Sequence, residues 1–232
     1  MLGVEDPSRL KREAVLAHEG TSALPVSKRY HRHKYHVVKR VFDVVAASIA
    51  LILLLPVFLI VSVFVAFASG FPVMFKQQRV GFRGKPFHIF KFRTMVRNAE
   101  EILKARPELL EEYKKNFKIE NDPRISKVGN FLRKSSLDEL PQLLNVVKGD
   151  MSLVGPRPIV VPELAKYGDH QDMYMAMRPG CTGLWQCGGR SATTYDERIA
   201  LDKEYFEKAG LRFDLYIIFK TVGAILFARG AR

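Results

Sequence analysis

An uncharged run from residue 44 to residue 75 limits the possible folds of this chain more than any other feature. Its stretch VVAASIALILLLPVFLIVSVFVAFAS is long enough to form a membrane segment. Pro56 lies near its middle, where a proline costs a continuous helix about 3 kcal/mol and bends it. The halves, 44–55 and 57–69, would each be only ~18–20 Å long, short of the ~30 Å hydrocarbon core. The run therefore predicts two short helices joined at Pro56.

Basic residues flank this run on both sides. Because cytoplasmic flanks carry the excess of Lys and Arg, both flanks are assigned to the cytoplasm. This predicts a re-entrant helical hairpin over 39–72, broken at Pro56, which enters one leaflet and returns. A tilted single span with a proline kink is the alternative. The flanking residues are Lys28, Arg29, Arg32, Lys34, Lys39 and Arg40 before the run, and Lys76, Arg79, Arg83, Lys85, Lys91 and Arg93 after it.

The formal charge of +13, from 37 Lys and Arg against 24 Asp and Glu, implies an anionic partner. Nucleic acid is disfavoured because the basic residues are scattered, with no recognised motif and no aromatic stacking platform. Residues 1–38 read as a basic polar arm that rests on anionic membrane lipids, and no removable signal peptide is expected. The two cysteines, Cys181 and Cys187, are interpreted as reduced.

Residues 73–232 are expected to form one cytoplasmic domain of the α+β class, predominantly helical. Strands over 73–80 and 86–95 form a small β-hairpin around a turn at 82–85. Helices are predicted over 99–117, with a break at Pro107, and over 125–134, 137–147, 195–209 and 213–228. Residues 151–162 are expected to be irregular, and 178–190 a Gly-rich loop. The amphipathic helices are expected at the membrane interface, the last one above all, although a core helix is the alternative for that segment.

The segment SSLDELPQL, residues 135–143, places two acidic side chains at the start of a helix. Ser136 and Glu139 match a capping box, so helix capping is one interpretation. The other is that Asp138 acts as a nucleophile, because carboxylates can form acyl-phosphate intermediates. No Walker loop, GxGxxG, HExxH or nucleophile-elbow motif offers a different chemistry.

Four basic side chains could neutralise a diphosphate near these carboxylates: Lys91, Arg93, Arg133 and Arg157. Arg157 lies in Gly-Pro-Arg-Pro, where the two prolines restrict the backbone. Phosphate recognition and a purely structural turn are both open for it. Around Trp185, glycines allow close backbone approach, and the indole either stacks on a ligand or anchors the loop.

Together, KRVFDVVAASIALILLLP, KFRTM, SSLDELPQLLNVVKGDMSLVGPRP and RPGCTGLWQCGGR resemble the bacterial sugar transferase family, the monotopic phosphoglycosyl transferases. The resemblance covers about 39–232. It implies a re-entrant helix at the cytoplasmic face of the bacterial inner membrane, Mg²⁺ dependence, a UDP-sugar donor and a polyprenyl (undecaprenyl) phosphate acceptor. Asp138 would be the nucleophile that expels UMP and would also meet Mg²⁺, with Glu139 as its partner. Lys91, Arg133 and Arg157 match the family's basic active-site positions.

The chain departs from the family pattern in two places. Many members have Ser before the helix-breaking proline, where this chain has Leu55, and larger members carry further transmembrane helices. The tail resembles members that transfer hexose phosphates such as galactose or glucose, in the first membrane step of exopolysaccharide, capsule, O-antigen or glycoprotein glycan synthesis. A non-catalytic membrane scaffold for envelope polysaccharide assembly is the alternative function. A homodimer is compatible with the sequence.

Overall fold

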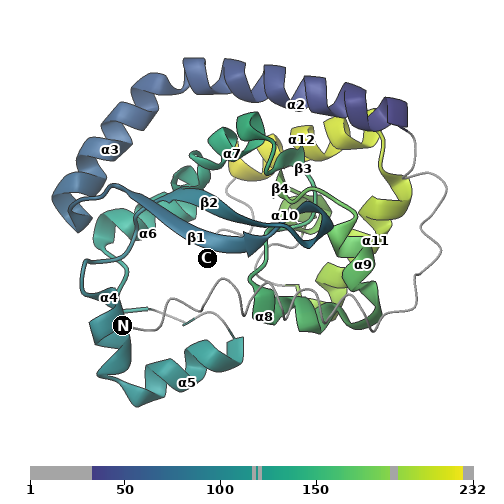
Figure 1. Cartoon of the computed structure of the whole chain (residues 1–232). Helices are drawn as coiled ribbons and strands as arrows, with labels where there is room; N and C mark the ends of the chain where they lie inside the picture. The colour runs from purple at the N-terminus through teal and green to yellow at the C-terminus, as the bar shows by residue number, and fades with distance from the viewer. Residues whose placement is uncertain (1–32, 117–118, 120–121, 189–192, 227–232) are drawn as a thin grey trace.

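The computed structural model describes residues 33–116, 119, 122–188 and 193–226. Two helices, α2 (His33–Leu53) and α3 (Leu55–Ser69), form an arch across the top of the molecule (Figure 1). The helix direction bends by 63° between them, with Pro56 in the first turn of α3, so the predicted break is confirmed. Helix α2 begins at His33, six residues before the predicted segment. Residues 1–32 of the basic arm lie outside the described residues.

Both legs of this arch pack against the same body. On α2, Lys39 Nζ donates to Asp214 Oδ2 at 2.9 Å, and Asp43 Oδ2 accepts from Ser152 Oγ at 2.7 Å. On α3, Val61 and Val65 are buried in a cluster with residues of the strands and of the next helices. Lys39 therefore belongs to a protein contact rather than to a lipid-facing flank.

The outer side of the arch is apolar and uncovered. Within the described part of the chain, each helix taken alone is too short or too polar to cross a membrane, whereas α2 and α3 together meet the length and composition required. The exposed apolar side chains of the arch include Val37, Val41, Val45, Ile49, Ile52, Leu53, Leu55, Leu59, Ile60, Val63, Phe64 and Phe67.

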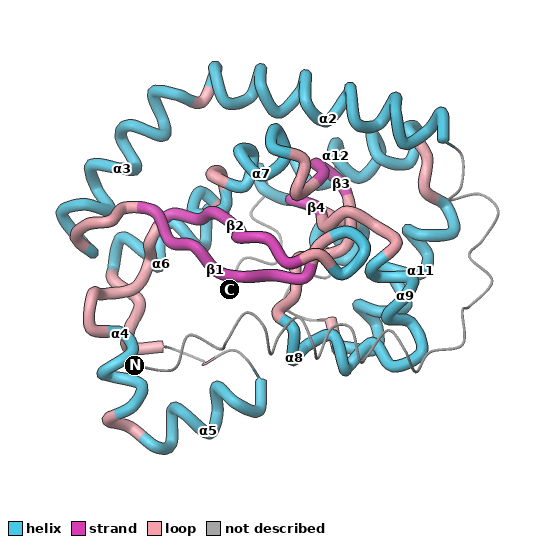
Figure 2. Tube along the Cα trace, in the orientation of Figure 1, coloured by secondary structure: helices cyan, strands magenta, loops and turns pink. Residues whose placement is uncertain are grey.

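Below the arch lies the predicted β-hairpin, made of β1 (Met74–Val80) and β2 (Pro86–Phe92) (Figure 2). The strands are antiparallel and pair from Met74 opposite Phe92 to Val80 opposite Pro86. The short helix η1 (Phe82–Gly84) makes the turn between them. The hairpin is confirmed, although β2 ends three residues earlier than predicted.

The predicted helix over 99–117 is two helices, α4 (Ala99–Lys104) and α5 (Pro107–Asn116), with the break at Pro107 as expected. Helix α6 (Lys127–Ser135) follows. The segment 137–147 was expected as one helix, which is wrong: it contains a 3-10 turn, η2 (Leu137–Glu139), and then α7 (Gln142–Lys148). Pro141 has no N–H for the Leu137 carbonyl, which instead accepts from the Leu140 N–H at 3.3 Å.

Two segments expected to be irregular contain a second, parallel pair of strands. These are β3 (Ser152–Val154) and β4 (Gly180–Thr182), with Ser152 opposite Gly180. The strands meet closely because they carry or adjoin glycines: a Cβ on Gly180 would lie 2.1 Å from the Gly155 nitrogen. Residues 184–188 also form a short helix, α10 (Leu184–Gly188), instead of a loop.

The remaining helices enclose the core beside this pair of strands. They are α8 (Val161–Leu164), η3 (Ala165–His170), α9 (Gln171–Met175), α11 (Tyr195–Lys208) and α12 (Leu211–Leu226). Helix α12 was expected either at the membrane interface or in the core. It has one face of each kind, because Ile217 is fully buried in the core whereas Leu215, Phe219 and Val222 are exposed. The fold is thus predominantly helical with a small β-hairpin, as predicted, and it contains a second pair of strands that was not predicted.

Candidate active site

Asp138 lies in the tight turn between α6 and α7 and is buried, with 8% of its surface exposed. Ser136, two residues before Asp138, has a left-handed backbone with φ of 59°, and its side chain caps no helix. The Glu139 side chain also turns away from Ser136 toward the β-hairpin. The capping-box interpretation is therefore wrong, and the two carboxylates are free for another role.

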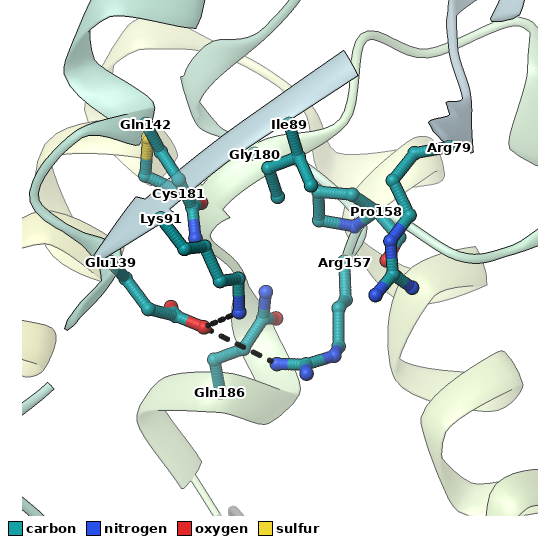
Figure 3. Close-up of a pocket in the computed structure, with 10 residues that line it drawn as sticks. All are labelled: Arg79, Ile89, Lys91, Glu139, Gln142, Arg157, Pro158, Gly180, Cys181 and Gln186. Carbon is teal, nitrogen blue, oxygen red and sulfur yellow. Dashed lines mark hydrogen bonds and ion pairs between the residues drawn. The ribbon is translucent and has the colours of Figure 1, made fainter. Parts of the chain in front are cut away.

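Two cations from distant segments converge on Glu139 (Figure 3). Lys91 Nζ, on β2, donates to Glu139 Oε1 at 2.5 Å. Arg157 Nη1 lies 3.9 Å from the same oxygen and comes from the turn after β3. The Arg157 side chain is 44% exposed and that of Glu139 30%, so this ion cluster is open to an incoming ligand.

The adjacent carboxyl groups have pKa values shifted in opposite directions. Burial, followed by the charge of Glu139, raises the pKa of Asp138 to about 6, although Lys91, Arg133 and Arg157 oppose this. Burial also acts to raise the pKa of Glu139, but Lys91 and Arg157 outweigh it and hold that pKa well below its usual range. Three of the four predicted cations, Lys91, Arg133 and Arg157, therefore act on Asp138.

Arg133 and Arg93 differ in their surroundings. Arg133, in the last turn of α6, is held by Thr94, whose Oγ1 accepts from the arginine Nε at 3.0 Å. Arg93 instead donates to the Phe71 carbonyl at 3.4 Å, at the end of the link from α3 to β1. Of the four basic residues predicted for the site, the structure brings Lys91, Arg133 and Arg157 to the carboxylates. Arg93, by contrast, lies beside the arch, where it contacts Phe71.

A pocket opens beside Glu139, and several of its residues were not predicted from sequence. Gln142 donates to Glu139 from the start of α7. Arg79, on β1, donates to the Pro158 carbonyl at 3.2 Å and thereby supports the turn that carries Arg157. The lining residues are Arg79, Ile89, Lys91, Glu139, Gln142, Arg157, Pro158, Gly180, Cys181 and Gln186. Most of the residues that were not predicted lie far from Glu139 in sequence, and Gln142, three positions away, carries no charge that would single it out.

Asn145 joins the helix after the carboxylates to the strand that carries Lys91. Its side chain is fully buried, donates to the His88 carbonyl at 2.7 Å and accepts from the Phe90 N–H at 2.9 Å. The amide thus occupies the place of a neighbouring strand along the edge of β2. This contact ties α7 to the strand that carries Lys91.

Trp185 anchors the α10 segment, and the guanidinium groups of two arginines lie close to its ring. It is buried, with the guanidinium carbon of Arg198 4.6 Å from the ring centroid and that of Arg157 5.9 Å away. Cys181 and Cys187 are unbridged, as predicted.

The donor set suits Mg²⁺ carried with a phosphorylated substrate. Mg²⁺ is usually bound by one or two carboxylates together with substrate phosphates, and Asp138 and Glu139 offer such a pair. Among the described residues, no group of three or more His, Cys, Asp or Glu comes together. The residues therefore fit an ion shared with a diphosphate rather than a cage made by protein alone.

Three similar proteins have names that refer to exopolysaccharide production or sugar-phosphate transfer. The chain is 45% identical over 199 residues to the exopolysaccharide production protein ExoY of Rhizobium meliloti, covering 84% of this chain and 88% of that protein. It is 44% identical over 221 residues to an undecaprenyl-phosphate galactose phosphotransferase of Salmonella typhimurium, covering 94% of this chain and 46% of that protein. A glucose-1-phosphate transferase of Escherichia coli, named as acting between UDP-glucose and undecaprenyl phosphate, is 38% identical over 196 residues, covering 80% of this chain and 39% of that protein.

The carboxylate pair, its cations and these relatives together identify the chain as an enzyme of the phosphoglycosyl transferase class. The sequence profile described as "Bacterial sugar transferase" matches residues 34–228. The chain belongs to the bacterial sugar transferase family.

Proposed function

We propose that the enzyme transfers a sugar-1-phosphate from a UDP-sugar to undecaprenyl phosphate, with release of UMP. The observation that carries this proposal is a buried carboxylate, Asp138, beside a partly exposed cluster of Glu139, Lys91 and Arg157. A nucleophile sheltered next to an open cationic site suits attack on a phosphate.

Two displacements at one phosphorus atom account for the reaction. The Asp138 carboxylate attacks the sugar-bearing phosphorus of the donor, a P–O bond to the carboxylate forms, and the bond to the UMP oxygen breaks. An oxygen of polyprenyl phosphate then attacks the same phosphorus, and the bond to Asp138 breaks. One small site can thus serve a water-soluble donor and a lipid acceptor in turn.

The cations neutralise the phosphate oxygens during both steps. Lys91, Arg133 and Arg157 act on Asp138 electrostatically, so a phosphate bound there meets the same positive field. When bound, Mg²⁺ would supply further charge neutralisation on the diphosphate, held by Asp138 with Glu139 beside it. Glu139, ionised and paired with Lys91, keeps that lysine directed at the site.

The relatives' names favour a hexose as the sugar, since they name galactose and glucose. The pathway would be the synthesis of exopolysaccharide or a related envelope glycan, as in the relative named for exopolysaccharide production.

The arch supports a position at the cytoplasmic face of the bacterial inner membrane, on anionic lipids. Because Asp43 on one leg and Val65 on the other pack on the same body, both legs lie on one side of any bilayer. A span through the membrane would place them on opposite sides. The exposed apolar face around Ile52 and Leu53 would enter one leaflet, as a re-entrant segment does.

Release of UMP from a panel of UDP-sugars, with undecaprenyl phosphate and Mg²⁺, tests this function. Asp138→Asn should abolish release, whereas the matched change Glu204→Gln, in an exposed ion pair on α11, should leave it intact. Undiminished turnover by Asp138→Asn would refute the nucleophile assignment. Absence of release from every donor in the wild type would favour the non-catalytic scaffold. A protein adduct of phosphosugar mass, trapped without acceptor, would establish the covalent step.

A further inference from the structure

The Pro156–Arg157–Pro158 turn needs a support that its own residues do not supply. The two prolines fix their own φ angles, and Pro158 also restricts the ψ angle of Arg157, but the φ angle of Arg157 and the ψ angles of the prolines stay free. The Arg157 side chain is nearly half exposed, and its ion pair with Glu139, at 3.9 Å, and its approach to the Trp185 ring, at 5.9 Å, are both long. The direction of the guanidinium therefore depends on how the backbone of this turn is held.

The hydroxyl of Tyr174, on α9, lies where the turn meets β1. It donates to the Arg157 carbonyl at 3.0 Å and accepts from the Ile159 N–H at 3.2 Å. The Val80 carbonyl is 3.4 Å away. Tyr174 is fully buried, and this burial raises the pKa of its hydroxyl far above the usual range, so the group keeps its proton and can donate.

We propose that Tyr174 is a positioning residue, whose hydroxyl holds the Arg157 backbone so that the guanidinium faces Glu139 and the donor's diphosphate. The inference rests on the proposed function, because it takes Arg157 as a phosphate-binding residue. Tyr174 touches no substrate itself.

Removal of this hydroxyl should affect the position of Arg157 more than the fold. The turn retains three other hydrogen bonds. The Gly180 N–H donates to the Pro156 carbonyl at 2.8 Å, the Val80 N–H donates to the Ile159 carbonyl at 2.9 Å, and Arg79 donates to the Pro158 carbonyl at 3.2 Å. A catalytic group displaced by about 1 Å can lower the rate by ~10²-fold. In Tyr174→Phe we expect kcat/KM for the UDP-sugar to fall about tenfold or more.

A neighbouring tyrosine provides a matched control. The rings of Tyr167 and Tyr174 lie 4.9 Å apart in the same buried cluster, but the Tyr167 hydroxyl donates to Asp202 at 2.8 Å and not to the turn. Tyr167→Phe should lower the melting temperature while kcat/KM stays within about twofold of the wild type. Equal losses of kcat/KM in the two variants would overturn the proposal.

A double-mutant cycle with Arg157→Gln distinguishes a positioning role of Tyr174 from a general structural role. If Tyr174 acts through Arg157, Tyr174→Phe should cause no further loss of kcat/KM in the Arg157→Gln enzyme. The same fold-loss in both backgrounds would overturn the positioning role while leaving the proposed function intact. An Arg157→Gln enzyme with unchanged kcat/KM would instead contradict the proposed function, and the positioning role with it.

Replacement of Tyr174 by 4-aminophenylalanine covers the case in which Tyr174→Phe does not fold. The amino group restores a donor to the Arg157 carbonyl and should recover most of the lost kcat/KM. 4-Methylphenylalanine, of similar shape but unable to donate, should not recover it. Equal activity of these two variants would overturn the proposal.

Discussion

Asp138 and Glu139 are neighbours in sequence, yet their side chains have different surroundings. Asp138 is buried at the turn, and Glu139 faces the open pocket with Lys91. Groups whose pKa values are pushed apart in this way commonly divide roles in a reaction. The division here suits Asp138 as the attacking group and Glu139 as the partner that orders the cations.

At the residue scale, Thr94→Val tests whether Arg133 must be held in place. The change keeps the shape of a buried side chain but removes the oxygen that accepts from Arg133. A hydrogen bond is worth about 1 kcal/mol net, so we expect kcat/KM to fall by roughly fivefold. The control is Thr221→Val, which removes a hydroxyl paired with Thr182 at 2.7 Å. Equal losses in both variants would argue against the role of Thr94.

Asp202→Asn should change how stability depends on pH. Burial raises the pKa of Asp202 to about 7, well above the unfolded value of 3.8. The native state therefore holds a proton that the unfolded chain releases, and its stabilising effect is lost as the pH rises from about 4 to about 7. An asparagine cannot ionise, so the melting temperature of the variant relative to wild type should be higher at pH 8 than at pH 5.

The control for this change is Glu204→Gln, an exposed acid on the same helix. Its melting temperature relative to wild type should be the same at both pH values. A constant difference between Asp202→Asn and wild type across this range would contradict the prediction.

The sequence indicated the charged members of the site but not the residues that hold them. Lys91, Arg133 and Arg157 were predicted because each lies in or beside a motif that resembles the sugar transferase family. Thr94 and Tyr174 act by hydrogen bonds to residues 39 and 17 positions away. Neutral side chains of this kind carry no local signal, so a three-dimensional structure was needed to find them.

At the scale of elements, Asn145 links α7 to β2 in the way a neighbouring strand would. Asn145→Ala should leave the His88 carbonyl and the Phe90 N–H without this partner, at a cost of about 2–4 kcal/mol. We expect a lower melting temperature and reduced UMP release, because Lys91 adjoins Phe90. Asn130→Ala, an exposed change on α6, is the control and should alter neither. Wild-type stability of Asn145→Ala would contradict the linking role.

The elements found from sequence are those with a local pattern. The β-hairpin showed two short strand-like runs on either side of a Gly-containing turn, and the arch showed an apolar run interrupted by Pro56. Strands β3 and β4 escaped prediction because each has three residues and they pair in parallel across a long separation. Their glycines look like loop residues until Gly155 and Gly180 are seen to meet.

At the scale of the whole molecule, the arch predicts that both flanks of the apolar run lie on one side of the membrane. Single cysteines at Lys34 and Lys76, both exposed, would be made in a Cys181→Ser, Cys187→Ser background. Neither should react with an impermeant maleimide in intact spheroplasts, and both should react in inverted vesicles.

A cysteine at the exposed Asp196, on α11, serves as the reference for the side on which the catalytic body lies. It should behave like the two flanking positions. Labelling of one flank from outside and the other from inside would establish the single kinked span instead.

The two packed legs of the arch have a consequence for bilayers of different thickness. A spanning helix must match the hydrocarbon core and responds to mismatch by tilting or by deforming the lipid. An apex that enters only one leaflet, rigidly joined to the body at Asp43 and Val65, has no far surface to match. The height of the carboxylates above the headgroups would then be fixed by the protein itself, and turnover should be the same in vesicles of short and long acyl chains.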